Sequence, residues 1–374
     1  MKFTCTKENL IHSLNLITSL TGKSTHLPIL ANVLISVTDS KVEMSTTNLE
    51  VAIRTSLRAK IDKPGSFTVP AKTLSEFVAL LRDGQVEIEL LENELSIVSG
   101  SSKTKIKGSS AEDYPVIPPI DEAHGYALDV TVFKEALSKV VIAVAKNEIR
   151  PELSGVYFGL LTERHQGLIL AATDSYRLSE AKIPVSQGSD ASQAILPARA
   201  VFEMIRLFGL GKNVSDESMV RLWVSDSQVA IRYDIFEMST RLIDGKYPDY
   251  AQIIPASFKT NATFPVDVMV SSIKAAGLFT ASGVNAVSFD LNQAGQTIAV
   301  SSTSTQTGEH SAMVEASVQG EENSILLNHR YVIEGLQHLS GETAELNVNG
   351  ADAPSLLRSV GSSDFIYIVM PIRQ

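Results

Sequence analysis

One supersecondary pattern occurs three times along this chain of 374 residues, and this repetition constrains the fold more than any single residue does. Each copy has a proline or a polar residue, a basic position just after it, and then an apolar stretch with helical spacing. The anchor residues, Pro70, Pro197 and Asn328, stand 127 and 131 residues apart. Solenoid repeats have periods of about 20–50 residues, so each copy is predicted to be a whole domain with its own core.

Two further markers keep nearly the same period. The strand starts at Val33, Val156 and Val287 are 123 and 131 residues apart, and a Tyr-Pro phrase closes the first two copies within residues 113–118 and 247–255. A repeat of this length fits the usual domain size of about 100–150 residues. The sequence therefore predicts three domains, at residues 1–123, 124–255 and 256–374.

Each copy reads as helix, strands, helix, strands. In the first copy, Leu10, Leu14 and Ile17 have the three- or four-residue spacing of a buried helical face. Residues 33–37 are rich in β-branched side chains, and residues 103–107 alternate polar and apolar like a strand with one solvent-exposed face. This order predicts an α+β fold with two helices packed on antiparallel sheets in each of three repeated domains.

Composition excludes several classes of protein. The lone cysteine, Cys5, has no partner for an internal disulfide, and no long apolar segment follows the first residues to act as a signal peptide. The wholly apolar run at residues 140–145 is far shorter than the roughly 20 residues of a membrane span. We therefore expect a cytoplasmic protein that does not enter a membrane.

Charge is distributed unevenly between the predicted helices and the rest of the chain. The formal net charge of −10 argues against a protein that grips nucleic acid through many phosphate contacts. Six predicted helical windows nevertheless carry ten basic and five acidic side chains; they are residues 7–20, 72–82, 131–146, 199–208, 268–281 and 329–339. Helices gathered on one side would make a mildly basic face, suited to loose, sequence-blind contact with a phosphate backbone.

Five short motifs, taken in order, carry a family resemblance. They are Leu-Pro-Ile-Leu at residues 27–30 and the stretches at 150–156, 172–178, 244–250 and 370–373. With them the chain resembles the bacterial DNA polymerase III beta subunit, the sliding-clamp family, over its whole length. The resemblance implies a non-catalytic processivity factor, in which two chains join head to tail into a ring of six similar domains around duplex DNA.

The same resemblance implies two sets of contact residues. The seam between subunits is expected to involve Thr104 and Ile106 on one side and Leu278 and Phe279 on the other. Sequence-independent contact with double-stranded DNA is expected from Lys23, Lys72, Asn147, Arg199 and Arg206. A closed ring stays on DNA by enclosure, which explains how a net acidic chain can serve DNA.

A third set belongs to a docking pocket for partner proteins. The resemblance implies that the polymerase III alpha subunit, the clamp loader and other proteins with a clamp motif insert a short extended peptide, often ending in leucine and phenylalanine, between domains 2 and 3. The matching residues are Arg150, Leu153, Thr173, Ser175, Tyr176, Arg177, Leu178, Pro248, Ile253, Ile368, Val369, Met370, Pro371, Ile372 and Arg373. Gln252 and Gln374 depart from the family pattern, which leaves the peptide preference open.

Two other readings of the sequence compete with a clamp. In the first, Asp174 and Arg177 are an acid and its orienting base in a hydrolase pocket. In the second, the chain is a linear three-domain adaptor that has the same peptide site but does not enclose DNA. The seven histidines lack the paired spacing of a metal site, and the glycine-containing stretch at 208–213 lacks the first glycine and the final hydroxyl residue of a phosphate loop. The sequence therefore predicts no catalytic residue, no metal and no cofactor.

Overall fold

The computed structural model describes residues 1–22, 27–123, 125–146, 149–188, 190–211, 218–281 and 283–373. It forms two compact units. Unit 1 comprises Met1–Lys134, Val185–Asp190 and Phe202–Leu242, and unit 2 comprises Glu135–Pro184, Ala191–Val201 and Ile243–Gln374. The middle copy of the repeat contributes to both units.

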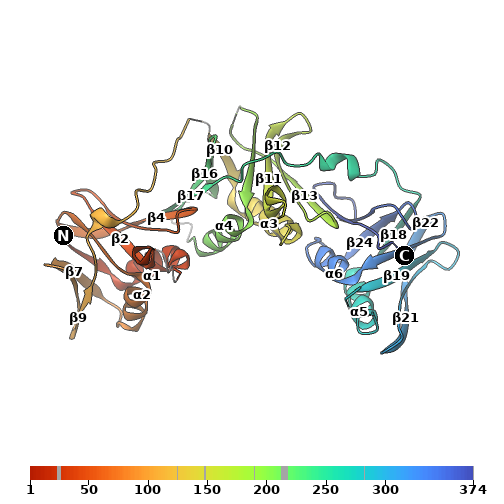
Figure 1. The fold of residues 1–374 in the computed structure, drawn as a ribbon, viewed down its shortest axis with the longest axis horizontal. Helices are drawn as coiled ribbons and strands as arrows, with labels where there is room; N and C mark the ends of the chain where they lie inside the picture. Colours follow the sequence, from red (N-terminus) through yellow and green to blue (C-terminus); the bar gives the residue numbers. More distant parts are fainter. Residues whose placement is uncertain are drawn as a thin grey trace. The chain divides into compact units, whose positions relative to one another are not determined.

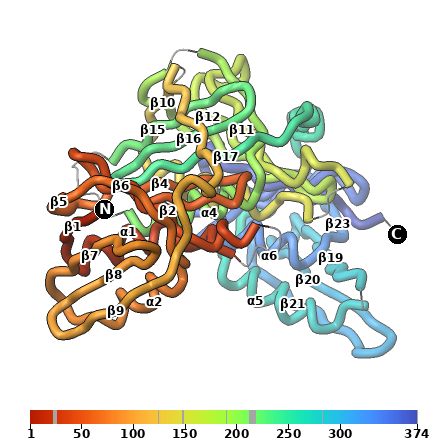
Figure 2. The backbone as a smooth tube through the Cα atoms, turned by 60° about the vertical axis from the view of Figure 1, so that its left-hand side comes forward, coloured from red at the N-terminus to blue at the C-terminus, as the bar shows by residue number. Residues whose placement is uncertain are grey.

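Unit 1 contains, in its described residues, a five-stranded sheet of order β5-β1-β7-β8-β9 and an eight-stranded sheet of order β10-β15-β16-β17-β4-β3-β2-β6. Its elements are β1 (Lys2–Thr6), α1 (Lys7–Ile17), β2 (Asn32–Val37), β3 (Val42–Thr47), β4 (Val51–Leu57), β5 (Ala59–Lys63), β6 (Gly65–Pro70), α2 (Ala71–Leu80), β7 (Gln85–Leu91), β8 (Glu94–Ser99), β9 (Ser102–Lys107), β10 (Gly125–Asp129), β15 (Met219–Val224), β16 (Gln228–Tyr233) and β17 (Phe236–Arg241). Figure 2 shows β7, β8 and β9 side by side.

Unit 2 contains a nine-stranded sheet of order β14-β11-β12-β13-β26-β25-β24-β18-β22 and a four-stranded sheet of order β21-β20-β19-β23, again counting described residues. Its elements are β11 (Gly155–Thr162), β12 (His165–Thr173), β13 (Arg177–Ile183), β14 (Ser192–Pro197), β18 (Thr260–Pro265), α5 (Val266–Gly277), β19 (Ala286–Asn292), β20 (Thr297–Ser304), β21 (Gly308–Glu315), β22 (Ser317–Gly320), β23 (Asn323–Asn328), α6 (His329–Gln337), β24 (Thr343–Val348), β25 (Ser355–Ser359) and β26 (Phe365–Val369). Helices α3 (Val130–Val140) and α4 (Ala198–Leu210) each have residues in both units.

The helices form where the sequence predicts them. Thr6 caps α1 by accepting a hydrogen bond from the Asn9 N–H, and Leu10, Leu14 and Ile17 bury one face of the helix. In unit 1, α1 lies beside α2 and packs on β4; in unit 2, α5 lies beside α6 (Figure 1). The strand pairs are antiparallel, which confirms the predicted α+β class.

One prediction about the order of elements is wrong. Each copy begins with a short strand, β1, β10 or β18, and not with its first helix. Strand β1 pairs with β5 and β7, for example Phe3 with Ile61 and with Ile88. A five-residue strand of this kind is defined by pairing with distant segments, which local periodicity does not reveal.

Successive copies of the repeat share a sheet within each unit. In unit 1, β17 of the second copy pairs with β4 of the first, with Met238 opposite Ile53. In unit 2, β13 of the second copy pairs with β26 of the third, with Arg177 opposite Val369. No helix in the described part of the chain is long and apolar enough to cross a membrane.

Candidate functional site

The site predicted to dock peptides is built around the turn that joins β12 to β13 in unit 2. The Thr173 hydroxyl accepts a hydrogen bond from the Ser175 N–H (3.1 Å) and donates one to the Arg177 carbonyl (2.7 Å). Asp174 Oδ1 accepts from the N–H groups of Tyr176 and Arg177, both at 3.0 Å. These side-chain bonds hold Ser175 in the left-handed region, with φ of 76°.

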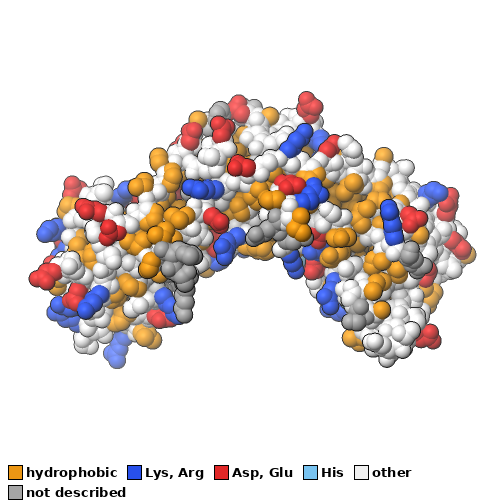
Figure 3. All heavy atoms as spheres, viewed as in Figure 1, with side chains coloured by type: hydrophobic (Ala, Val, Ile, Leu, Met, Phe, Trp, Pro, Cys, Tyr) orange, Lys and Arg blue, Asp and Glu red, His pale blue; other side chains and the backbone are white. Residues whose placement is uncertain are grey.

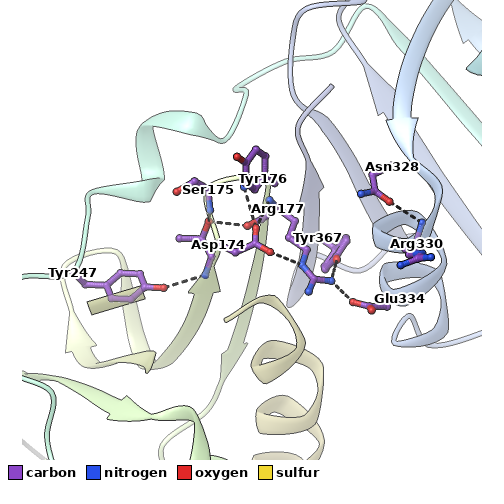
Figure 4. Close-up of polar contacts among 10 residues, drawn as sticks. Asp174, Ser175, Tyr176, Arg177, Tyr247, Asn328, Arg330, Glu334 and Tyr367 are labelled. Atoms are coloured by element: carbon purple, nitrogen blue, oxygen red, sulfur yellow. Dashed lines mark hydrogen bonds and ion pairs between the residues drawn. The ribbon is translucent and has the colours of Figure 1, made fainter. Parts of the chain in front are cut away.

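A buried tyrosine forms a hydrogen bond with the backbone of this turn. The Thr173 N–H donates to the Tyr247 hydroxyl at 3.1 Å (Figure 4). Burial raises the pKa of Tyr247 well above its ordinary value, although the hydrogen bond from the Thr173 N–H opposes the shift. The turn therefore presents Tyr176, which is 65% exposed, at the surface.

Arg177, one of the residues that the family resemblance assigns to the pocket, is buried. Its side chain is 4% exposed; Nε donates to Asp174 Oδ2 (3.1 Å), and Nη1 donates to the Tyr367 hydroxyl (3.2 Å) and to the Glu334 carboxylate. The guanidinium also lies over the Tyr331 ring, 4.4 Å from its centroid. Burial lowers the pKa of Arg177, but Tyr367 and Glu334 outweigh it, and the net shift is upward.

An apolar cluster forms the floor beneath the turn. Leu153, Leu178 and Ile368 are buried there together with Tyr247 and Tyr250. The end of the chain closes over one side of the turn, because the Met370 N–H donates to the Tyr176 carbonyl (2.9 Å) and the Ile372 N–H to the Leu326 carbonyl (2.8 Å).

The predicted pocket residues differ in accessibility. Ile253 is 38% exposed, and Ser175 and Arg373 are also at the surface. Arg150 is exposed and forms an ion pair with Glu152 at 3.0 Å. Pro248, Met370, Pro371 and Ile372 are half-buried, whereas Thr173 and Val369 are buried.

The residues predicted to contact DNA have contrasting environments. Lys72 has a side chain that is 82% exposed, 3.8 Å from Glu76, and Arg199 is exposed near the start of α4. Arg206 is instead bonded within unit 1: Nη1 donates to the Asn15 carbonyl (2.9 Å), and Nη2 to the Leu16 carbonyl (2.5 Å). Lys23 and Asn147 lie outside the described residues. Basic and acidic side chains are interspersed on the face shown in Figure 3.

The predicted seam residues lie on or near two edge strands. Strand β9, with Thr104 and Ile106, ends one sheet of unit 1, and β21 ends the smaller sheet of unit 2, as far as the described residues extend. Ile106 is 7% exposed and faces its own core, while Leu278, at the end of α5, is 73% exposed. Phe279 stacks on His310 with ring centroids 5.7 Å apart.

The residues read as a possible hydrolase pair have structural roles in the turn. Asp174 accepts bonds from two backbone N–H groups and from Arg177. Among the described residues, no group of three or more His, Cys, Asp or Glu side chains is placed to hold a metal ion. Sequence reasoning missed Glu334 and Tyr331 as neighbours of the turn, because they follow it by more than 150 residues.

Three family models together match nearly the whole chain. They describe the DNA polymerase III beta subunit: its N-terminal domain at residues 1–118, its central domain at 127–249 and its C-terminal domain at 251–373. The chain belongs to the DNA polymerase III beta subunit family. This confirms the resemblance inferred from the motifs and places the chain among non-catalytic processivity factors.

Individual relatives agree over full length. The beta sliding clamp of Bacillus subtilis (strain 168) is 27% identical over 384 residues, covering 100% of both chains, and that of Synechococcus elongatus is 27% identical over 100% of this chain and 99% of its own. The crystal structure of the sliding clamp from Bacillus subtilis is 27% identical and has a TM-score of 0.92, over 100% of this chain and 99% of that chain. The beta subunit from Thermotoga maritima is 26% identical and has a TM-score of 0.90, with the same coverage.

Proposed function

We propose that this chain is a DNA sliding clamp, two copies of which close head to tail into a ring of six domains around duplex DNA. The observation that carries this proposal is the full-length match of three consecutive family domains. The domains proposed are residues 1–123, 124–255 and 256–374. The ring tethers the replicative polymerase and other partners for processive replication and repair in the cytoplasm.

Enclosure reconciles the acidic chain with a DNA partner. A protein with a net charge of −10 gains little from counterion release unless its basic side chains are gathered at the duplex. Lys72 and Arg199 lie on helices and have exposed side chains, which supports a role in touching phosphate without reading sequence. Weak contacts suffice, because a closed ring does not leave DNA sideways.

Closure of the ring needs a seam between unlike ends of the two chains. Edge strands β9 and β21 offer backbone groups for pairing across such a seam, and a pairing of this kind would leave neither edge open to aggregation. The exposed Leu278 supplies an apolar side chain beside it. The contact is heterologous, and closure after two copies follows from its rotation angle.

Partner proteins dock, in this proposal, at the turn of unit 2. An extended peptide places a leucine or phenylalanine against the exposed Tyr176 and Ile253, above the buried cluster of Leu153, Leu178 and Ile368. Burying one such anchor stabilises the complex by about 1.5–3 kcal/mol. The polymerase alpha subunit, the clamp loader and other proteins with a clamp motif are the proposed partners.

Retention on circular DNA tests the proposal. The protein is loaded by its loader complex onto a nicked plasmid, separated from free protein by gel filtration, and then treated with a restriction enzyme that cuts once. A clamp comigrates with the circle and is released after linearisation. Retention on linear DNA would contradict enclosure. Failure to load onto DNA, with peptide binding intact, would indicate the linear adaptor. Turnover of nucleic acid by the purified protein would support a hydrolase.

A further inference from the structure

The turn at the docking site has a counterpart in the first copy of the repeat, between β3 and β4. There the Thr47 hydroxyl accepts from the Leu49 N–H (3.0 Å) and donates to the Val51 carbonyl (2.9 Å). Asn48 Oδ1 accepts from the N–H groups of Glu50 (3.1 Å) and Val51 (2.8 Å). These are the bonds that Thr173 and Asp174 make in the second copy.

The counterpart also has the same backbone shape and the same support. Leu49 has φ of 75°, against 76° for Ser175. The Thr47 N–H donates to the Tyr114 hydroxyl at 3.2 Å, as the Thr173 N–H does to Tyr247. Two segments 126 residues apart therefore adopt one conformation, set by a threonine, an Asx side chain and a tyrosine.

Arg177 is not needed to form this turn. Its place in the first copy is taken by Val51, which is uncharged and 2% exposed. A buried cation destabilises a protein unless its partners compensate for lost hydration. The partners of Arg177 therefore stabilise a buried cation that the first copy lacks.

Apart from Asp174, those partners lie on two elements outside the turn. Glu334 and Tyr331 belong to α6, and Tyr367 belongs to β26. Figure 4 shows Glu334 and Tyr367 beside Arg177. Helix α6 approaches β26 closely at Gly335, where an added Cβ would lie 2.4 Å from the Tyr367 ring. Arg177 thus joins the turn to a helix and a strand that already pack tightly on each other.

The residue before Arg177 is the exposed centre of the proposed docking site. Tyr176 projects its ring to solvent, and its carbonyl accepts from the Met370 N–H at 2.9 Å. We propose that Arg177 is a positioning residue, and that Glu334, which lies outside the docking site, sets peptide affinity by holding Arg177 and hence Tyr176 in place. The inference rests on the proposed docking function.

A double-mutant cycle on the full chain tests it. Binding of a fluorescein-labelled peptide ending in Leu-Phe is measured by anisotropy for the wild type, Glu334→Gln, Arg177→Val and the double variant. Glu334→Gln keeps the size of a side chain that is 43% exposed, and Arg177→Val restores the residue of the first copy. Each single change is expected to weaken binding about 5-fold or more, and the double variant should bind no worse than Arg177→Val alone.

A matched control comes from the repeat. Glu76 occupies on α2 the position of Glu334 on α6, and its described ion pair is with Lys72. Glu76→Gln should leave peptide affinity unchanged, and a single cooperative melting transition shows that Glu334→Gln is folded. Should Arg177→Val fail to fold, Tyr367→Phe takes its place in the cycle.

Two results would overturn the inference while leaving the docking site intact. One is wild-type affinity in Glu334→Gln; the other is a double variant whose loss equals the product of the two single losses, since independent residues behave in that way. If the wild type itself does not bind the peptide, the proposed docking site is refuted. The wild-type titration distinguishes that outcome from failure of the inference about Glu334.

Discussion

Arg199 and Arg206 lie seven residues apart on α4 and have different tasks. Arg199 is exposed, whereas Arg206 donates to carbonyls near the end of α1 and to Glu203 at 2.5 Å. A guanidinium in the second arrangement satisfies carbonyls that a helix end leaves without partners. Arg206 is therefore part of the packing of unit 1, and Arg199 is the better candidate for a phosphate contact.

Substitution by alanine separates the two roles. Arg206→Ala should lower the free energy of unfolding by about 1–3 kcal/mol, because it leaves helix-terminal carbonyls with fewer donors. Arg199→Ala should change it by less than about 0.5 kcal/mol. Denaturant unfolding followed by circular dichroism measures both.

The two arginines should also differ in their contribution to the salt dependence of DNA binding. Arg199→Ala should reduce the slope of log K against log salt by about 0.9 in a duplex-binding titration. An unchanged slope in Arg199→Ala, or an equal loss of stability in both variants, would contradict this division of roles.

Tyr114 is expected to make the free energy of unfolding depend on pH in the alkaline range. Burial raises the pKa of its phenol from 10.0 to about 12, although the Thr47 N–H opposes the shift. The unfolded chain ionises near pH 10 while the folded chain stays protonated, so stability is fully present below pH 10 and falls as the pH rises toward 12. The loss amounts to about 2–3 kcal/mol.

Comparison with Tyr114→Phe isolates this contribution. The variant is less stable at pH 8, because the hydroxyl accepts from Thr47, but its free energy of unfolding should decline less between pH 10 and pH 12 than that of the wild type. Urea titrations at several pH values supply the slopes. Parallel pH profiles would rule out Tyr114 as the titrating group.

At the scale of elements, the two edge strands and the chain end carry the proposed assembly. The four-stranded sheet of unit 2 and the five-stranded sheet of unit 1 each end, within the described chain, in a strand with one free edge. Apolar side chains stand near them: Leu80 at the end of α2 is 85% exposed and Met313 on β21 is 62% exposed. Large apolar side chains at such positions are typical of subunit interfaces.

The seam can be tested with the double substitution Leu278→Ala and Phe279→Ala. Truncating leucine or phenylalanine side chains that a seam buries commonly costs about 2–5 kcal/mol each, so the dimer should dissociate at concentrations where the wild type remains associated. Sedimentation velocity over a dilution series gives the constants. Val116→Ala, at a residue 91% exposed outside the edge strands, is the control, and an intact dimer in the double variant places the seam elsewhere.

The chain end is predicted to serve the docking site and not the fold. Removing residues 370–374 breaks the bond from the Met370 N–H to Tyr176 and uncovers one side of the turn. Binding of a peptide ending in Leu-Phe should fall below detection by anisotropy, while sedimentation still reports a dimer. Undiminished peptide affinity in the truncated chain would exclude the proposed site.

At the scale of the whole molecule, enclosure and phosphate contact respond differently to salt. Screening at about 1 M salt shortens the Debye length to about 3 Å and removes most surface attraction. Retention of the loaded protein on a nicked circle should therefore persist at salt concentrations that abolish binding to a linear duplex. Gel filtration at stepped salt concentrations measures both. Parallel loss from circular and linear DNA would indicate that the protein is held by phosphate contacts and not by enclosure.

The three-fold repeat, the six helices and the α+β class were determined by the sequence alone. Local apolar spacing, as in Leu10, Leu14 and Ile17, is visible within a few turns of chain, and it predicts which face of a helix is buried. The family motifs at residues 150–156 and 172–178 likewise identified the segments that meet at the turn.

Only the tertiary structure decided what the charged side chains do. The family resemblance assigns Arg177 to the pocket, yet its partners Glu334 and Tyr367 lie 157 and 190 residues away along the chain. Arg206 likewise bonds carbonyls 190 and 191 residues before it. Hydrogen bonds between distant segments depend on how the sheets and helices pack, and no local pattern encodes that packing. The opening strands β1, β10 and β18 escaped prediction for the same reason.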